Sequence, residues 1–175
     1  YEEWGLDCVK YLEGMWAFAI YDKQKNKIIL SRDRFGEKPL YYYRKNKTLI
    51  FGSELNYFKF FLKEKLSINE KKLINFNSFG YRSFFSNQET FFEDINFFPK
   101  GEIWSFDKDL KITSSDKYWS LNYKPDSKIS FSEAVEKTEE LLINSLKIRL
   151  RSDVNIGISL SGGIDSGLIG SIKEI

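Results

Sequence analysis

Six residues near the carboxyl end of the chain, Ser161-Gly-Gly-Ile-Asp-Ser166, combine the residue types that hold a phosphate and a metal ion. The two glycines let the backbone approach an anion with no Cβ atom in the way. The two serines add hydroxyl donors, and Asp165 offers a hard oxygen ligand for Mg²⁺. The run therefore predicts a site for a phosphate-bearing ligand and its metal.

The residues on either side of this run predict the elements that position it. Apolar residues at 155–160 predict a buried strand, and the small and apolar residues that follow predict the first turn of a helix. Such a junction presents free backbone N–H groups and the positive end of a helix dipole. The run matches neither G-x-x-x-x-G-K-[ST] nor G-x-G-x-x-G. A glycine turn that only connects strand to helix is the alternative interpretation.

The composition excludes several classes of site. The 175 residues include one cysteine and no histidine, so the chain alone cannot supply a Cys/His zinc site, a Ser-His-Asp triad or a disulfide framework. A net charge of +2 with both signs interspersed gives no signature of nucleic-acid or membrane binding. No apolar run approaches the roughly 20 residues of a membrane span. The lone cysteine fits a reducing compartment, and a cytoplasmic protein is expected.

The remaining pattern predicts an α+β part followed by an α/β part. Residues 122–129 are polar and contain Pro125, which indicates a linker between the two. Ser130 and Glu133 form the Ser-x-x-Glu capping box of the helix that follows. The other expected elements are helices over 6–13, after Ser53 and over 69–76, and strands over 15–21, 27–32, 41–44, 48–52, 102–106 and 111–113.

The carboxyl-terminal motif carries a family resemblance. Ser161–Ser166 resembles the pyrophosphate loop of the N-type ATP pyrophosphatases, and the longer run Arg149–Ile169 resembles the synthetase domain of glutamine-hydrolysing asparagine synthases. The usual pattern in that domain is S-D-V-P-x-G-x-x-L-S-G-G-L-D-S-S. Asn155, Ile164 and Gly167 stand where proline, leucine and a second serine are usual. None of these changes removes a phosphate-binding group.

Segments of the amino-terminal part resemble class II glutamine amidotransferase domains, in the same order and spacing. Leu12–Asp22 is similar to their L-x-G-M-F-A-F-A-x-x-D strand, and Arg32–Tyr42 to their R-D-x-x-G-x-x-P-L-Y-Y segment. Phe51–Glu54 resembles the strand that ends in Ser-Glu, and Phe91–Gly101 the stretch that closes the domain. Tyr118-Trp119 resembles the exit from it. The resemblance covers nearly the whole chain.

The resemblance implies two domains, both incomplete in this chain. Residues 1–121 are expected to form the C-terminal half of an αββα sandwich like that of the Ntn hydrolases. Residues 130–175, after the linker at 122–129, are expected to begin an ATP-pyrophosphatase domain. The parallel sheet of that domain would start with the strand at 155–160, next to the nucleotide. The chain is expected to be an internal fragment that is inactive alone.

The resemblance also implies a reaction for the intact protein. A glutaminase half releases ammonia from glutamine, and a synthetase half uses ATP and Mg²⁺ to convert aspartate into β-aspartyl-AMP and pyrophosphate. Ammonia then gives asparagine and AMP. The resemblance implies that the Leu160 backbone contacts the nucleotide and that Asp165 binds Mg²⁺. The residues implied to bind the ATP phosphates are Ser161, Gly162, Gly163 and Ser166.

No glutaminase catalytic residue is assigned to this chain. Class II amidotransferases use the thiol of an amino-terminal cysteine, whereas Cys8 is internal and is expected to be a small buried hydrophobe. A similar enzyme acting on another carboxylate, such as a cell-surface or β-lactam precursor, and a non-catalytic relative remain alternatives. The expected partners are glutamine, aspartate and ATP, with a homodimer of the intact protein and no nucleic acid or membrane.

The segment 32–42 has two interpretations. Gly36 permits a turn, and Pro39 fixes the backbone before a strand. Asp33 is expected to pair with Arg32 or Arg34 in a partly buried loop. The loop either shapes a glutamine pocket or forms a corner between two sheets, and the corner is favoured because most buried charged pairs are architectural.

Overall fold

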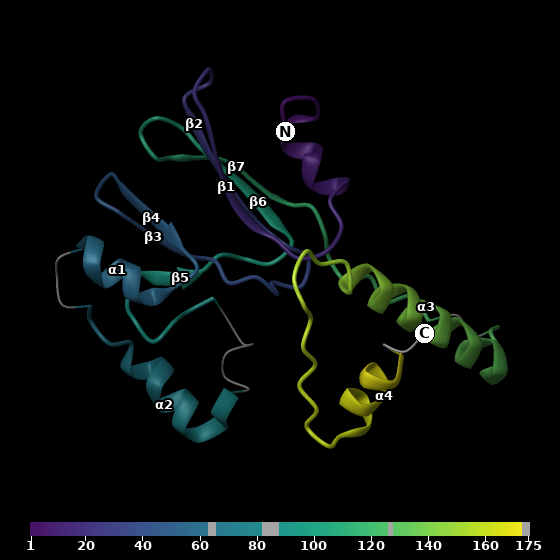
Figure 1. Cartoon of the computed structure of the whole chain (residues 1–175). Coiled ribbons are helices and arrows are strands. Elements are labelled where there is room, and N and C mark those ends of the chain that lie inside the picture. Colours follow the sequence, from purple (N-terminus) through teal and green to yellow (C-terminus); the bar gives the residue numbers. More distant parts are fainter. Residues whose placement is uncertain (63–65, 82–87, 126–127, 173–175) are drawn as a thin grey trace. The chain divides into compact units, whose positions relative to one another are not determined.

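The computed structural model of the protein describes residues 1–62, 66–81, 88–125 and 128–172. The chain divides into two compact units, Tyr1–Leu121 and Asn122–Ile175. The first unit contains two antiparallel sheets and short helices, and the second contains two helices joined by a long non-helical segment (Figure 1). None of the helices in the described ranges is both long and apolar enough to cross a membrane.

The first sheet has four antiparallel strands in the order β1-β2-β6-β7. Its strands are β1 (Ala17–Asp22), β2 (Lys27–Arg32), β6 (Glu102–Phe106) and β7 (Ile112–Lys117). The central strands β2 and β6 pair with Leu30 opposite Trp104, although the whole second sheet lies between them in the sequence. This long-range pairing brings the beginning and the end of the first unit together.

The second sheet has the order β4-β3-β5. Its strands are β3 (Tyr41–Lys45), β4 (Thr48–Gly52) and β5 (Ile95–Phe97). The turn between β3 and β4 consists of Asn46 and Lys47, with φ angles of 51° and 60°. Two consecutive positive φ angles define the two-residue turn whose twist matches that of paired strands. The predicted hairpin is therefore confirmed.

The described residues of the first unit also form short helices. They are the 3₁₀ helix η1 (Gly5–Lys10), α1 (Leu55–Leu62) and α2 (Glu70–Phe79). α1 packs on β4 and buries Phe58 completely. α2 begins after Asn69, whose side chain accepts a hydrogen bond of 3.0 Å from the backbone N–H of Lys72 and so caps the helix.

The bounds of several elements differ from those predicted, among them α2, which was expected over 69–76 and spans Glu70–Phe79. The helix expected over 6–13 is η1, which ends at Lys10. The strand expected over 15–21 begins two residues later, at Ala17. The strand expected over 111–113 continues to Lys117, because β6 offers pairing partners along this whole length.

Apolar clusters cover both faces of the first sheet. Alternation along β2 points Leu30 toward the second sheet and Ile29 toward η1. The cluster between the sheets contains Leu30, Leu40, Phe98, Trp104 and Phe106, with Tyr42 and Leu49 against it. The cluster under η1 contains Cys8, Val9, Ile29 and Ile103. The first sheet is therefore covered by η1 on one face and by the second sheet on the other.

A tight corner at residues 32–38 follows β2 and leads to the second sheet. Asp33 lies in it with 1% of its surface exposed. One carboxylate oxygen accepts hydrogen bonds from the N–H groups of Phe35 (3.1 Å) and Glu37 (3.0 Å), and the other accepts from Lys38 (2.9 Å). Burial by itself raises the pKa of Asp33, but the backbone donors outweigh it and hold that pKa below its usual value.

Arg32 stabilises the same corner by binding backbone carbonyl groups. Its guanidinium donates to the carbonyl oxygens of Gly36 (2.6 Å), Lys38 (2.8 Å) and Phe98 (2.9 Å). Gly36 has φ +71°, and a Cβ atom there would lie 3.0 Å from the guanidinium carbon. The corner is thus closed from both sides: Asp33 binds its N–H groups and Arg32 binds its C=O groups.

The expected ion pair of Asp33 is wrong. Within the described residues, no ion pair joins Asp33 to Arg32 or Arg34. The Asp33 carboxylate already accepts hydrogen bonds from the backbone N–H groups of Phe35, Glu37 and Lys38. Binding to backbone donors costs no side-chain entropy of a charged partner. These contacts are those of the structural corner that the sequence favoured.

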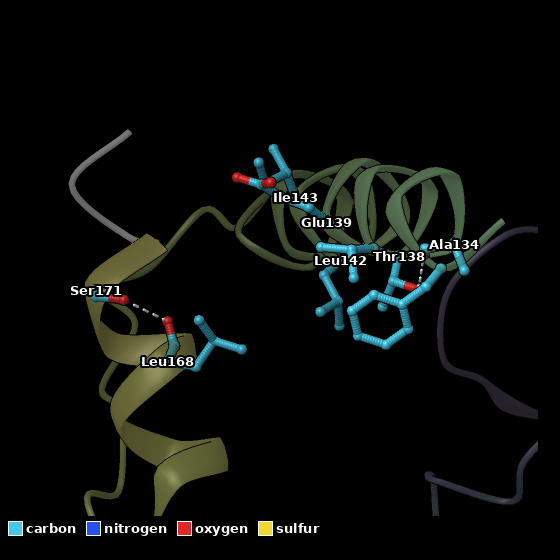
Figure 2. Close-up of a pocket in the computed structure, with 9 residues that line it drawn as sticks. Ala134, Thr138, Glu139, Leu142, Ile143, Leu168 and Ser171 are labelled. Atoms are coloured by element: carbon cyan, nitrogen blue, oxygen red, sulfur yellow. Dashed lines mark hydrogen bonds between the residues drawn. The ribbon is translucent and has the colours of Figure 1, made fainter.

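The second unit consists of α3 (Phe131–Arg149) and α4 (Ile164–Ile172) with the segment between them. The predicted capping box of α3 is confirmed: the Ser130 hydroxyl accepts from the Glu133 N–H at 3.3 Å, and the Glu133 carboxylate accepts from the Ser130 N–H at 2.9 Å. The two helices border an apolar groove of about 700 Å³ (Figure 2). Its lining includes Phe131, Val135, Thr138, Leu142 and Leu168.

The predicted strand at 155–160 is wrong. These residues adopt no regular secondary structure, and the described part of the second unit contains no strand that could pair with them. A strand depends on a neighbour for its N–H and C=O partners, so an apolar pattern alone cannot form one. Val154 and Leu160 consequently remain 76% and 66% exposed. The parallel sheet expected here is absent from the described residues.

The Asp33 carboxylate predicts a pH-dependent contribution to stability. Asp33→Asn in the full-length protein should lower the free energy of unfolding by about 2–3 kcal/mol at pH 7, because backbone donors lose a charged acceptor. A carboxylate whose pKa is lower in the folded than in the unfolded protein stabilises the fold at pH values above its unfolded pKa. This stabilisation is lost as the pH falls through the folded pKa. The difference from wild type should therefore shrink below about pH 4.

Thermal unfolding between pH 3 and pH 7 measures this difference. The exposed Asp109→Asn is the matched control, and it should leave stability unchanged across the range. If the stability difference between Asp33→Asn and wild type stays constant with pH, the negative charge of Asp33 does not stabilise the corner.

Candidate functional site

The glycine turn at 161–163 leads directly into α4. Gly162 has φ +79°, a conformation that other residues adopt only with strain. A Cβ atom at Gly162 would meet nothing within 4 Å, so the space over this residue is open. The N–H of Gly167 donates to the Gly163 carbonyl at 3.0 Å, which is the first hydrogen bond of the helix. The predicted turn and helix start are confirmed, without the strand before them.

The two serines of the loop are bonded to each other. Their hydroxyl oxygens lie 3.0 Å apart, and the Ser166 hydroxyl donates to the Gly163 carbonyl at 3.1 Å. A hydroxyl has one proton, so Ser161 supplies the proton shared by the two side chains. Ser166 also accepts from the Ser161 N–H at 3.3 Å. The hydroxyl groups thus hold the turn closed.

The open side of the turn faces an exposed helix start. The first N–H groups of a helix have no acceptor within the helix, and they lie at the positive end of its dipole. Ile164 is 90% exposed and Gly162 carries no side chain, so an anion can reach these groups. This geometry fits a phosphate group at the beginning of α4.

Asp165 lies in the first turn of α4 and is exposed. Within the described residues, no group of three or more carboxylate, cysteine or histidine side chains gathers to bind a metal. Mg²⁺ often takes only one or two carboxylates, with substrate phosphates and water as its other ligands. A single exposed aspartate beside an anion site fits that donor set.

Leu160 and Gly170 form a contact that the sequence did not reveal. A Cβ atom at Gly170 would lie 3.2 Å from a methyl group of Leu160. Leu160 therefore rests on α4 one turn beyond the loop, and a larger residue at 170 would require its side chain to shift. The signal was a second glycine within an apolar helix, which often marks a close approach.

The chain matches two protein-family descriptions. Residues 1–119 match the family described as a glutamine amidotransferase domain, and residues 137–174 match asparagine synthase. The chain belongs to the glutamine amidotransferase family. The two matches follow one another in the order that the resemblance predicted, and the predicted family is confirmed.

Relatives of this amidotransferase chain cover nearly all of it. It is 39% identical to the "Putative asparagine synthetase [glutamine-hydrolyzing] 2" of Methanocaldococcus jannaschii, over 99% of this chain and 34% of the relative. It is 34% identical to asparagine synthetase [glutamine-hydrolyzing] 2 of Bacillus subtilis, over 97% of this chain and 24% of the relative. It is 30% identical to amidase chry2 of Gibberella zeae, also over 97% and 24%. The chain spans a quarter to a third of the length of these relatives.

The positive φ of Gly162 gives a test of the loop. Gly162→Ala should weaken ATP binding to the full-length protein about tenfold, because a left-handed conformation costs a residue with a Cβ atom about 1–2 kcal/mol. The matched control is Gly157→Ala, since Gly157 also has open space around it but no positive φ. Titration calorimetry measures both. Equal affinities for the two variants would mean that the turn does not contribute to nucleotide binding.

Proposed function

We propose that this chain is part of a glutamine-hydrolysing asparagine synthetase. The observation that supports this most directly is the order of the matches: an amidotransferase domain over 1–119 is followed by asparagine synthase over 137–174. We assign residues 1–121 to the glutaminase domain and 130–175 to the beginning of the ATP-binding domain. The intact protein is proposed to be a cytoplasmic homodimer.

The proposed reaction has two parts. In the first, glutamine and water give glutamate and ammonia. In the second, the aspartate side-chain carboxylate attacks the α-phosphorus of ATP, pyrophosphate leaves, and β-aspartyl-AMP forms. Ammonia then attacks the acyl carbon and displaces AMP, which gives asparagine. Each nitrogen atom released by the first part is used once in the second.

The loop 161–166 has the donors that the second part requires. The N–H groups at the start of α4 bind the phosphates, and the Ser161 and Ser166 hydroxyls exchange their mutual bonds for phosphate oxygens. The Leu160 backbone contacts the nucleotide, and Gly163 allows the phosphates to come close. Asp165 would hold Mg²⁺, which would supply positive charge to balance that of the departing pyrophosphate. The backbone N–H groups, which the helix start holds in place, stabilise the same charge.

The glutaminase half is proposed to belong to an αββα sandwich of the Ntn-hydrolase type. The layers of the first unit, with η1 on one sheet and α1 on the other, support this assignment. The nucleophile in such an enzyme is an amino-terminal cysteine, and we assign that role to no residue of this chain. Cys8 has 7% of its surface exposed and packs with Val9 and Ile29, as a small buried hydrophobe does.

An amidotransferase for another carboxylate is the second candidate. The observation that favours it is the 30% identity to two fungal proteins named amidases, over 97% of this chain in both cases. The proposed nucleotide chemistry would be the same in both candidates, because only the carboxylate differs. Aspartate-dependent release of pyrophosphate by the full-length protein distinguishes them. Release that does not respond to aspartate would favour the second candidate.

Asp165 gives a test of the ATP-binding half. Asp165→Asn in the full-length protein should lower aspartate-dependent pyrophosphate release at least about a hundredfold, because a neutral amide binds Mg²⁺ poorly. Glutamate release from glutamine in the absence of ATP should be unchanged. The exposed Asp153→Asn, in the same unit, is the matched control. A pyrophosphate rate equal to that of this control would exclude Asp165 as the metal ligand.

A further inference from the structure

A cavity of about 420 Å³ lies beside the corner at 32–38. The corner contributes part of its lining, and the chain between β5 and β6 contributes most of the rest. All of the lining residues belong to the described part of the first unit. The volume is in the range of pockets that hold small organic ligands. The residues that give the cavity its chemistry are Arg32, Phe35, Phe97, Lys100, Glu102 and Lys117.

The Arg32 guanidinium is one of the charged groups that line the cavity. Three of its five N–H groups donate to the carbonyl oxygens that close the corner. The other two find no acceptor among the residues that the structure describes. Burial lowers the pKa of Arg32, and the nearby charge of Asp33 offsets only part of this effect. A negative group in the cavity would therefore stabilise a guanidinium that the protein leaves partly unpaired.

Two exposed lysines add to this positive charge. The Lys100 Cβ atom lies 3.2 Å from where a Cβ atom of Gly36 would be, so Lys100 lies beside the corner. Lys117 is the last residue of β7 and pairs with Glu102 of β6. Across the described ranges neither lysine forms an ion pair. The Glu102 carboxylate instead accepts the indole N–H of Trp104 at 2.7 Å.

Cationic side chains thus outnumber carboxylates in the cavity by three to one. Its other characteristic is aromatic. The guanidinium of Arg32 lies over the Phe97 ring, with its central carbon 5.8 Å from the ring centre. Phe35 is 56% exposed, so its ring is accessible to a ligand. Aromatic rings and guanidinium planes both favour a flat, apolar partner.

We propose that this cavity binds a small organic anion that carries an aromatic ring, with a phosphate or a carboxylate as its negative group. The negative group contacts Arg32 and the two lysines, and the ring lies against Phe35 and Phe97. The proposed function assigns its nucleotide contacts to the loop 161–166 and assigns no ligand to this cavity. The inference does not rest on the proposed function, because it uses only residues of the first unit.

Phenyl phosphate is a suitable probe, because it joins one aromatic ring to one phosphate. Titration calorimetry on the full-length protein should show that it binds about two- to twelvefold more tightly than inorganic phosphate, the gain that one aromatic contact gives. The double variant Lys100→Ala/Lys117→Ala should weaken the binding of phenyl phosphate about tenfold, because two ammonium groups are lost. The matched control is Lys108→Ala, an exposed lysine in the turn after β6, which should leave the affinity unchanged.

Three outcomes would overturn the proposal. No binding of phenyl phosphate to the wild-type protein would exclude the site. Equal affinities for the double variant and Lys108→Ala would show that the anion binds elsewhere. If Gly162→Ala then weakens the binding, the anion occupies the loop 161–166, and the proposed nucleotide site gains support while this one is excluded. Equal affinities of the wild-type protein for phenyl phosphate and inorganic phosphate would exclude a role for the aromatic rings.

Discussion

The first unit depends on one buried carboxylate and the backbone that surrounds it. Asp33 has almost no exposed surface, so its charge persists only because N–H groups of residues 35–38 bind it. Those bonds fold the chain back on itself at the end of β2. Arg32 completes the corner by binding carbonyl groups, including that of Phe98 after β5. One hydrogen-bonded corner thereby ties the first sheet to the second.

The second unit has no comparable constraint among its described residues. Its helices border an apolar groove, and Phe131 on α3 is 87% exposed. What fixes this unit locally is hydrogen bonding at helix starts: the capping box at Ser130 and the serine pair at 161 and 166. Such local bonds specify how a helix begins, whereas the placement of one element on another needs buried apolar area. The motif is therefore well formed even though the sheet expected beside it is not.

The sequence predicted the elements that depend on interactions between neighbouring residues. It did not predict correctly those that depend on residues far away in the chain. The β3–β4 hairpin follows from a turn at Asn46, and the α3 start from the Ser130–Glu133 spacing. The strand at 155–160 failed because its pairing partner must come from elsewhere in the chain. The prediction of an ion pair for Asp33 was wrong for another reason. Neighbouring opposite charges in the sequence suggest a side-chain pair, but the backbone N–H groups of a tight turn lie closer to a buried carboxylate. The Leu160–Gly170 contact depends on how the loop folds onto α4, which the sequence pattern does not specify.

The candidate loop is ordered by hydrogen bonds between its own side chains and backbone. Ser161 and Ser166 satisfy each other, so the turn is held in one conformation while the N–H groups of α4 remain open. A phosphate that binds there replaces a hydroxyl–hydroxyl bond with charge-assisted bonds, which are roughly twice as strong. The phosphate site proposed at this turn would therefore draw on donors that the fold already orients, because the helix start fixes the N–H groups and the serine pair fixes the turn before them.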